Sequence, residues 1–209
     1  MKTIIFDLDN TLLFLSNDWD KYYLKTINKY NLNIIPKELY SYIGLFEKSH
    51  SNTIVSMKDI ANYMNHELSF NISEAALNDL WNNYVNIPLL HTDKARNILS
   101  YLSKKYRIIG YSNQFRSVQL KRLRKYDLDK YFSEIYGWDI IPAKPSKTGI
   151  ETIVNSENTK DFILIGDSIE VDLEMPDSMG IETILYNSNN IKQNKYKEIK
   201  DIMELKNIL

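Results

Sequence analysis

The chain has 209 residues, enough for one domain or for one domain that carries a smaller insertion. Its 44% hydrophobic and 25% charged residues are typical of a soluble globular protein. The net charge of -1 gives no electrostatic reason to expect a nucleic-acid partner. The absence of cysteine excludes disulfides and thiolate metal sites, and it fits the cytoplasmic location that we expect.

No targeting or membrane-spanning segment is predicted. The apolar part of the N-terminus is too short for the core of a signal peptide, and carboxylates follow it at once. No stretch approaches the ~18 apolar residues of a membrane span. We therefore expect no contact with membranes, and we expect a monomer, with a dimer as the alternative.

The first predicted element is a strand over Ile4, Ile5 and Phe6, an apolar run that suits the centre of a sheet buried on both faces. The region from residue 16 to residue 86 instead shows helical spacing of its apolar residues. Four helices are predicted here, over residues 19–30, 36–46, 54–64 and from an N-cap at Ser73 to residue 84.

Helices and strands alternate after Pro88. Strands are predicted over 106–111, 135–137, 162–165 and 183–186. Helices are predicted from a cap at Thr92 or Asp93 to residue 102, over 120–126 and 146–154, before Gly180, and over 195–209. This alternation predicts an α/β fold with a doubly wound, mainly parallel sheet. Residues 1–15 and 88–209 are expected to form this core, and residues 16–87 an inserted helical cap.

Several predicted strands are followed by polar side chains at their carboxyl ends, where open parallel sheets bind ligands. These side chains are Asp7 and Asp9, Ser112 and Asn113, Lys144, and Asp167. Carboxylates that converge without histidine or cysteine form an oxygen site suited to Mg²⁺. A lysine and a serine beside them can bind a phosphate, so the set predicts phosphoryl transfer.

Four motifs in order resemble those of the haloacid dehalogenase superfamily. They are Asp7-Leu8-Asp9-Asn10-Thr11, Ser112-Asn113, Lys144-Pro145, and Gly166-Asp167 with Asp172 downstream. The resemblance covers the whole chain, and it implies a Rossmann-like core. The helical insertion resembles the alpha-helical cap of the first type in that family. One departure is Met175-Pro176, where the family often has Gly-Ala.

The resemblance implies a role for each acid. Asp7 would attack phosphorus and become an aspartyl phosphate, while Asp9 would protonate the leaving oxygen and then take a proton from water. Mg²⁺ would be held by the side chains of Asp7 and Asp167 and by the backbone carbonyl of Asp9. Asp172 would ligate the metal or orient water bound to it.

The remaining motif residues would bind the substrate, which we expect to be a small phosphorylated metabolite. Ser112, with Asn113, and Lys144 would hold the phosphoryl oxygens, and Lys144 would also reduce repulsion among the acids. A loop carrying Lys48, Ser49 and His50 either faces the site or has no role in it. A basic cluster is predicted to be a solvated helix surface and not a nucleic-acid site; it contains Lys121, Arg122, Arg124 and Lys125.

The predicted function is Mg²⁺-dependent hydrolysis of a small phosphomonoester. Dehalogenases of the superfamily lack the second aspartate of the first motif, so Asp9 argues against that activity. A phosphomutase, which returns the phosphoryl group to its substrate, is the nearest alternative. A phospho-accepting receiver domain is disfavoured by the position of the acids and by the large insertion. A catalytically idle phosphate-binding protein is the alternative from another class.

Overall fold

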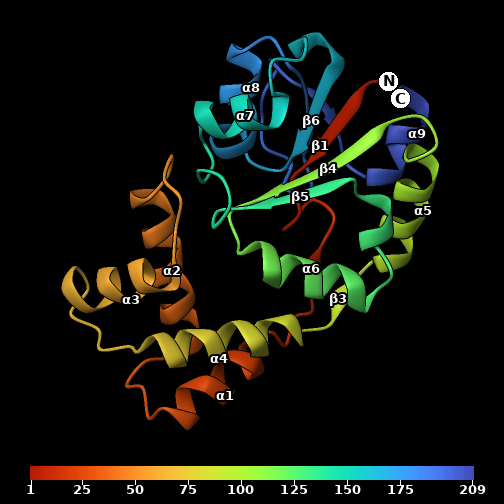
Figure 1. The fold of residues 1–209 in the computed structure, drawn as a ribbon. Coiled ribbons are helices and arrows are strands. Elements are labelled where there is room, and N and C mark those ends of the chain that lie inside the picture. Colours follow the sequence, from red (N-terminus) through yellow and green to blue (C-terminus); the bar gives the residue numbers. More distant parts are fainter.

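The computed structural model describes all 209 residues and contains a six-stranded sheet flanked by helices (Figure 1). All the strands are parallel, in the order β5-β4-β1-β6-β7-β8. The strands are β1 (Thr3–Phe6), β4 (Arg107–Ser112), β5 (Glu134–Gly137), β6 (Phe162–Gly166), β7 (Glu182–Tyr186) and β8 (Lys197–Ile199). The predicted α/β fold with a parallel sheet is therefore confirmed.

The central strand β1 is buried on both faces, as its apolar run predicted. Ile4 and Phe6 belong to the apolar cluster on one face, and Ile5 belongs to the cluster on the other. The first face is covered by α5 (Thr92–Leu102), α6 (Arg116–Lys125) and α9 (Leu205–Ile208). The second face is covered by α7 (Lys147–Val154) and by the segment that leads into α8 (Glu174–Ser178).

A block of four helices lies between the first strand and the rest of the core in sequence. Its helices are α1 (Asp20–Lys29), α2 (Pro36–Ser49), α3 (Met57–His66) and α4 (Glu74–Val85), and we call them the helical block. Pro36 begins α2, and the hydroxyls of Ser56 and Ser73 cap α3 and α4 by accepting from backbone N–H groups. Most of one apolar cluster belongs to the helical block, and Phe115, Val118, Trp138 and Ala143 of the sheet domain complete it.

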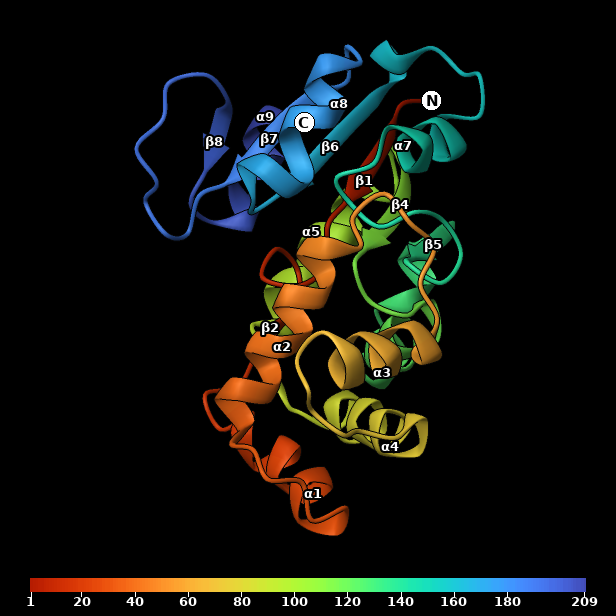
Figure 2. The same cartoon turned by 90° about the vertical axis from the view of Figure 1, so that its left-hand side faces the viewer.

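The helical block contacts the sheet domain at several places, and two of them involve pairing of the backbone. A short antiparallel pair, β2 (Phe14–Leu15) and β3 (Leu89–Leu90), lies where the predicted cap begins and ends. The loop between α2 and α3 lies against the loop after β5 (Figure 2). Three backbone hydrogen bonds of 2.8 Å join these loops, from Asn52 to Ala143, from Val55 to Trp138, and from Ala143 to Thr53. The block is thus attached far from its chain connections as well as at them.

Several predicted boundaries were wrong. The third helix begins at Met57 and not at residue 54, because Ser56 caps it and Val55 bonds to the core. Residue 91, and not Thr92 or Asp93, is the N-cap of α5. Residues 195–209 do not form one helix, since β8 adds an edge strand there. The N–H of Met203 then bonds to Asp201, which starts a 3₁₀ turn (Ile202–Glu204) before α9.

The remaining helical turns connect these elements. They are 3₁₀ turns over Asp129–Tyr131 and Thr159–Asp161, and a π-helical turn over Ile169–Leu173 that leads into α8. The short helix predicted before Gly180 is confirmed by α8. No helix in the structure is both long enough and apolar enough to cross a membrane.

Candidate active site

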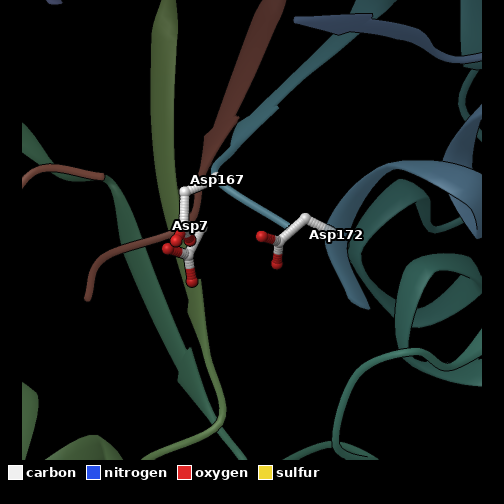
Figure 3. Close-up of side chains that lie close together, drawn as sticks. All are labelled: Asp7, Asp167 and Asp172. Atoms are coloured by element: carbon white, nitrogen blue, oxygen red, sulfur yellow. The ribbon is translucent and has the colours of Figure 1, made fainter. Parts of the chain in front are cut away.

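Three aspartates meet at the carboxyl ends of β1 and β6 (Figure 3). Asp7 directly follows β1, and its N–H donates to the Ile165 carbonyl of β6 at 2.8 Å. Asp167 directly follows β6, and Asp172 lies in the π-helical turn after it. One carboxylate oxygen from each lies within 4.8 Å of the others. Three oxygen donors without nitrogen or sulfur suit a hard divalent cation such as Mg²⁺.

Gly166 permits this close approach. A Cβ at this position would lie 2.5 Å from the Cβ of Asp172, which is closer than two non-bonded carbon atoms can approach. The backbone N–H of Ser168 also donates to the Asp172 carboxylate at 3.0 Å. The Gly166-Asp167 motif therefore places one acid at the end of the strand and leaves room for a second above it.

Lys144 is the cation of this cluster. Its Nζ is buried and donates to Oδ1 of Asp7 and to Oδ1 of Asp172, each at 2.6 Å. Burial alone would lower the pKa of Lys144, but the carboxylates of Asp172 and Asp7 raise it above its usual value. The ammonium is therefore charged at neutral pH and ties two of the three acids together.

One ammonium does not offset three acids. Burial raises the pKa of Asp7 well above its usual value, against the lowering effect of Lys144, and the charges of Asp172 and Asp167 add to the rise. Burial, with the charge of Asp172, raises the pKa of Asp167 to about 6. Oδ2 of Asp7 is buried without a hydrogen-bond partner. An excess of buried carboxylates with an unpaired oxygen is the electrostatic condition that a bound divalent cation relieves.

Asn113 and Lys144 are joined through the backbone. The Asn113 amide donates to the Lys144 carbonyl at 2.9 Å and accepts from the Lys144 N–H at 2.7 Å. This pair of bonds fixes the loop that carries the lysine. The predicted phosphate ligand Asn113 thus has its side chain engaged in holding Lys144 in place.

The carboxylate of Asp9 is separate from the three-aspartate cluster. Oδ1 accepts from Nη1 of Arg122 at 2.5 Å and from the Tyr84 hydroxyl at 3.2 Å. Oδ2 accepts from Nε2 of Gln119 at 2.5 Å and from the Ser112 hydroxyl at 3.5 Å. Gln119 also donates to Ser112 at 2.8 Å. The two aspartates of the first motif therefore have different partners, which allows them different roles.

The prediction that the basic cluster is a solvated surface was wrong for Arg122. Its side chain is 1% exposed, whereas Lys121, Arg124 and Lys125 are exposed as predicted. Arg122 lies three residues after Gln119, so both side chains point from the buried face of α6 toward Asp9. The signal in the sequence was this spacing of an amide and a guanidinium on the apolar face of the helix.

Arg122 also contacts the helical block. Its guanidinium carbon lies 4.6 Å from the centre of the Tyr84 ring, a cation–π geometry. Burial alone would lower the pKa of Arg122, but the carboxylate of Asp9 holds it above its usual value. Nε and Nη2 have no hydrogen-bond partner, so the buried charge is stabilised by the ion pair with Asp9, the Nη1 hydrogen bond to Oε1 of Gln119 at 2.9 Å and the contact with Tyr84. The structure joins a core helix and a block helix at Asp9.

The four aspartates, Ser112, Asn113 and Lys144 line one cavity of about 260 Å³ between the sheet and the helical block, and Gln119 and Arg122 lie behind it. On the side of the helical block it is lined by Tyr23, Tyr40, Ile43, Glu47, Trp81 and Tyr84. Lys48, Ser49 and His50 are not among its lining residues, and the His50 ring stacks on Phe46 with 4.1 Å between ring centres. Glu47, one turn earlier on the inner face of α2, is the residue that sequence reasoning missed.

A family model of haloacid dehalogenase-like hydrolases matches residues 4–186, which include all four motifs. The chain belongs to this family. It is therefore an enzyme of the hydrolase type. The comparison with curated proteins gave no match.

Solved structures with the same fold include several kinds of haloacid dehalogenase-like enzyme. The HAD-hydrolase YfnB from Bacillus subtilis, bound to magnesium, has a TM-score of 0.78 at 20% identity, over 100% of this chain and 98% of that one. A HAD phosphatase from Thermococcus onnurineus has a TM-score of 0.67 at 18% identity, over 100% and 97%. A 2-haloacid dehalogenase from Pseudomonas syringae has a TM-score of 0.72 at 15% identity, over 100% and 97%. At these identities the likeness shows the fold alone.

Proposed function

We propose that this haloacid dehalogenase-like hydrolase releases phosphate from a small phosphomonoester, with Mg²⁺ as cofactor and Asp7 as nucleophile. The observation that carries the proposal is the setting of Asp7. It lies at the end of the central strand, its Oδ1 is bound to Lys144, and its Oδ2 has no partner. It lines the same cavity as Asp9, Ser112 and Asp167.

The chemistry proceeds in two steps. A carboxylate oxygen of Asp7 attacks phosphorus, and the bond between phosphorus and the leaving oxygen breaks. Asp9 gives its proton to that leaving oxygen. In the second step Asp9 takes a proton from a water molecule, which attacks phosphorus and frees Asp7. The four donors around Asp9 fix both of its oxygens against the cavity wall, and they favour the ionised carboxylate that takes the proton from water in the second step.

Asp7, Asp167 and Asp172 would hold Mg²⁺, and the backbone carbonyl of Asp9 is proposed as a further ligand. The ion would supply positive charge that neutralises the transferring phosphoryl group. Lys144 and Ser112 would bind phosphoryl oxygens. The side chain of Asn113 bonds to the Lys144 backbone, so it would help to position Lys144 for the phosphate.

Asp9 supports phosphoester cleavage over dehalogenation, although several structural neighbours are dehalogenases. A carbon–halogen bond breaks without a proton for the leaving group, so an acid beside the nucleophile has no use in that reaction. An ester oxygen leaves far more readily when it is protonated.

The test is release of inorganic phosphate by purified protein from p-nitrophenyl phosphate and from a panel of phosphorylated metabolites. We expect release with Mg²⁺, none with EDTA, and recovery when Mg²⁺ is restored. Equal amounts of phosphate and dephosphorylated product identify a phosphatase. Conversion of a sugar phosphate without free phosphate would identify a mutase instead, and absence of turnover on every ester would favour an idle binding protein.

A further inference from the structure

One face of α2 lines the cavity opposite the catalytic aspartates. Tyr40, Ile43 and Glu47 stand at positions i, i+3 and i+7, so they share one side of the helix. Tyr23 of α1 lies beside them, with the centre of its ring 6.4 Å from that of Tyr40. This surface lines the same cavity as Asp7 and Asp9, where the leaving group of the proposed substrate would extend.

The polar groups of this surface have no partners within the protein. No hydrogen bond or ion pair reaches the carboxylate of Glu47, and none is made by the hydroxyls of Tyr40 and Tyr23. On the sheet side, by contrast, Lys144 bonds to Asp7 and Asp172, and Asp9 accepts from four donors. A half-buried carboxylate without a donor is costly, and a ligand that supplies a donor offsets that cost.

The charge of the cavity restricts what that ligand can be. Its lining contains five carboxylates, Asp7, Asp9, Glu47, Asp167 and Asp172, and one ammonium, Lys144. Burial, together with the charge of Asp9, raises the pKa of Glu47 to about 7, so the site already resists negative charge. A substrate that brought a further carboxylate toward α2 would be repelled.

We propose that Glu47 selects the substrate, which is a phosphomonoester whose leaving group carries hydroxyl or ammonium donors and no acid. The class is that of phosphorylated polyols and amino alcohols. Glu47 accepts from the donor, and the hydroxyls of Tyr40 and Tyr23 are placed to complete the contact. This inference rests on the proposed phosphoesterase function and adds the chemistry of the leaving group to it.

Two pairs of esters test the inference, because the members of each pair differ at a single group. Glycerol 3-phosphate carries a hydroxymethyl group where 3-phosphoglycerate carries a carboxylate. Phosphoethanolamine carries an aminomethyl group where phosphoglycolate carries a carboxylate. We expect kcat/KM to favour the donor-bearing member of at least one pair by about tenfold or more. The pair with the larger ratio identifies the donor as hydroxyl or ammonium.

Glu47→Gln should reduce that ratio several-fold, chiefly through KM, because the lost contact is made in the bound ground state. Glu47→Lys should favour the acidic member. Glu67→Gln is the matched control, since Glu67 is exposed at the end of α3 and lies outside this cavity. It should leave both ratios as they are in the wild type.

p-Nitrophenyl phosphate separates the two claims. If it is hydrolysed while neither pair shows the preference, or while Glu47→Gln leaves the ratios unchanged, the selection by Glu47 is wrong and the phosphatase function stands. If none of the five esters is hydrolysed with Mg²⁺, the proposed function is wrong and the inference fails with it.

Discussion

The two sides of the cavity satisfy their polar groups in opposite ways. On the sheet side, Lys144 and Arg122 are buried and form ion pairs with the aspartates at the strand ends. On the side of α1 and α2, Glu47 and the hydroxyls of Tyr23 and Tyr40 have no partner in the protein. On the sheet side the oxygen without a partner, Oδ2 of Asp7, is one that we propose meets the metal or the phosphate that all substrates share. The helical side is incomplete until a leaving group occupies it.

The two sides are joined at Asp9. Tyr84 of the helical block donates to its carboxylate, and the same tyrosine ring packs on Arg122 of the core. The acid proposed to protonate the leaving oxygen is therefore held by residues of both the core and the helical block. The predictions below test the sheet side, the junction and the metal cluster in turn.

Among the variants that test the two sides and their junction, the largest effect is expected for Asp9→Asn. Loss of the acid should lower kcat by about 10²–10⁴ for alkyl phosphates, whose leaving oxygen needs a proton. The loss should be much smaller for p-nitrophenyl phosphate, whose leaving group is stable as an anion. Equal losses for both kinds of ester would count against the acid role of Asp9.

Lys144→Met should lower kcat/KM for phosphate release by about 10²–10³. It also leaves Asp7 and Asp172 buried without their cation, so unfolding should become easier by about 3–5 kcal/mol, measured by urea denaturation with EDTA present. Lys147→Met provides the comparison, because the exposed Lys147 reaches only Glu151 at 3.5 Å. Similar behaviour of the two variants would show that Lys144 has no special place in the cluster.

Arg122→Met tests the junction between the two sides. We expect kcat to fall about tenfold to a hundredfold as Asp9 loses its main anchor, with a changed dependence on the leaving group. Arg124→Met, on the exposed face of the same helix, should behave like the wild type. If Arg122→Met only lowers stability and keeps the leaving-group dependence of the wild type, Arg122 does not position Asp9.

The smallest effect is a pH dependence of thermal stability. The pKa of Asp167 rises from its ordinary 3.8 to about 6 on folding, so the folded state binds more protons than the unfolded state within that window. The stability of the metal-free protein should therefore fall as pH rises through it. Mg²⁺ binds the ionised carboxylates, so it should raise Tm more at about pH 7 than at about pH 5. An equal Mg²⁺ effect at both pH values would remove Asp167 from the proposed metal site.

The acids on the sheet side were predictable because their positions depend on the residues next to them in sequence. Asp7 and Asp167 directly follow buried apolar runs, and parallel strands bring their carboxyl ends to one edge. Lys144 and Asp172 could be found by motif, but their ion pair depends on how the loops fold. The edge strand β8 was missed because it has three residues and only Ile199 is buried, too few to show a period of two.

The helical side was not predictable in the same way. Residues 48–50 were left as either facing the site or having no role in it, because they lie between two predicted helices. The inward position belongs to Glu47 on the apolar face of α2. Arg122 was assigned to the surface together with its three basic neighbours, which do lie there. In both cases the rotation of a helix against its neighbours decided the outcome, and that rotation is set by tertiary packing.

The most direct test of the account is phosphate release by the wild type and by Asp7→Asn, purified in parallel and assayed with p-nitrophenyl phosphate and Mg²⁺. The account predicts turnover by the wild type and none above background by Asp7→Asn, with circular dichroism showing that both are folded. Turnover by folded Asp7→Asn at a rate near that of the wild type would contradict the assignment of Asp7 as nucleophile.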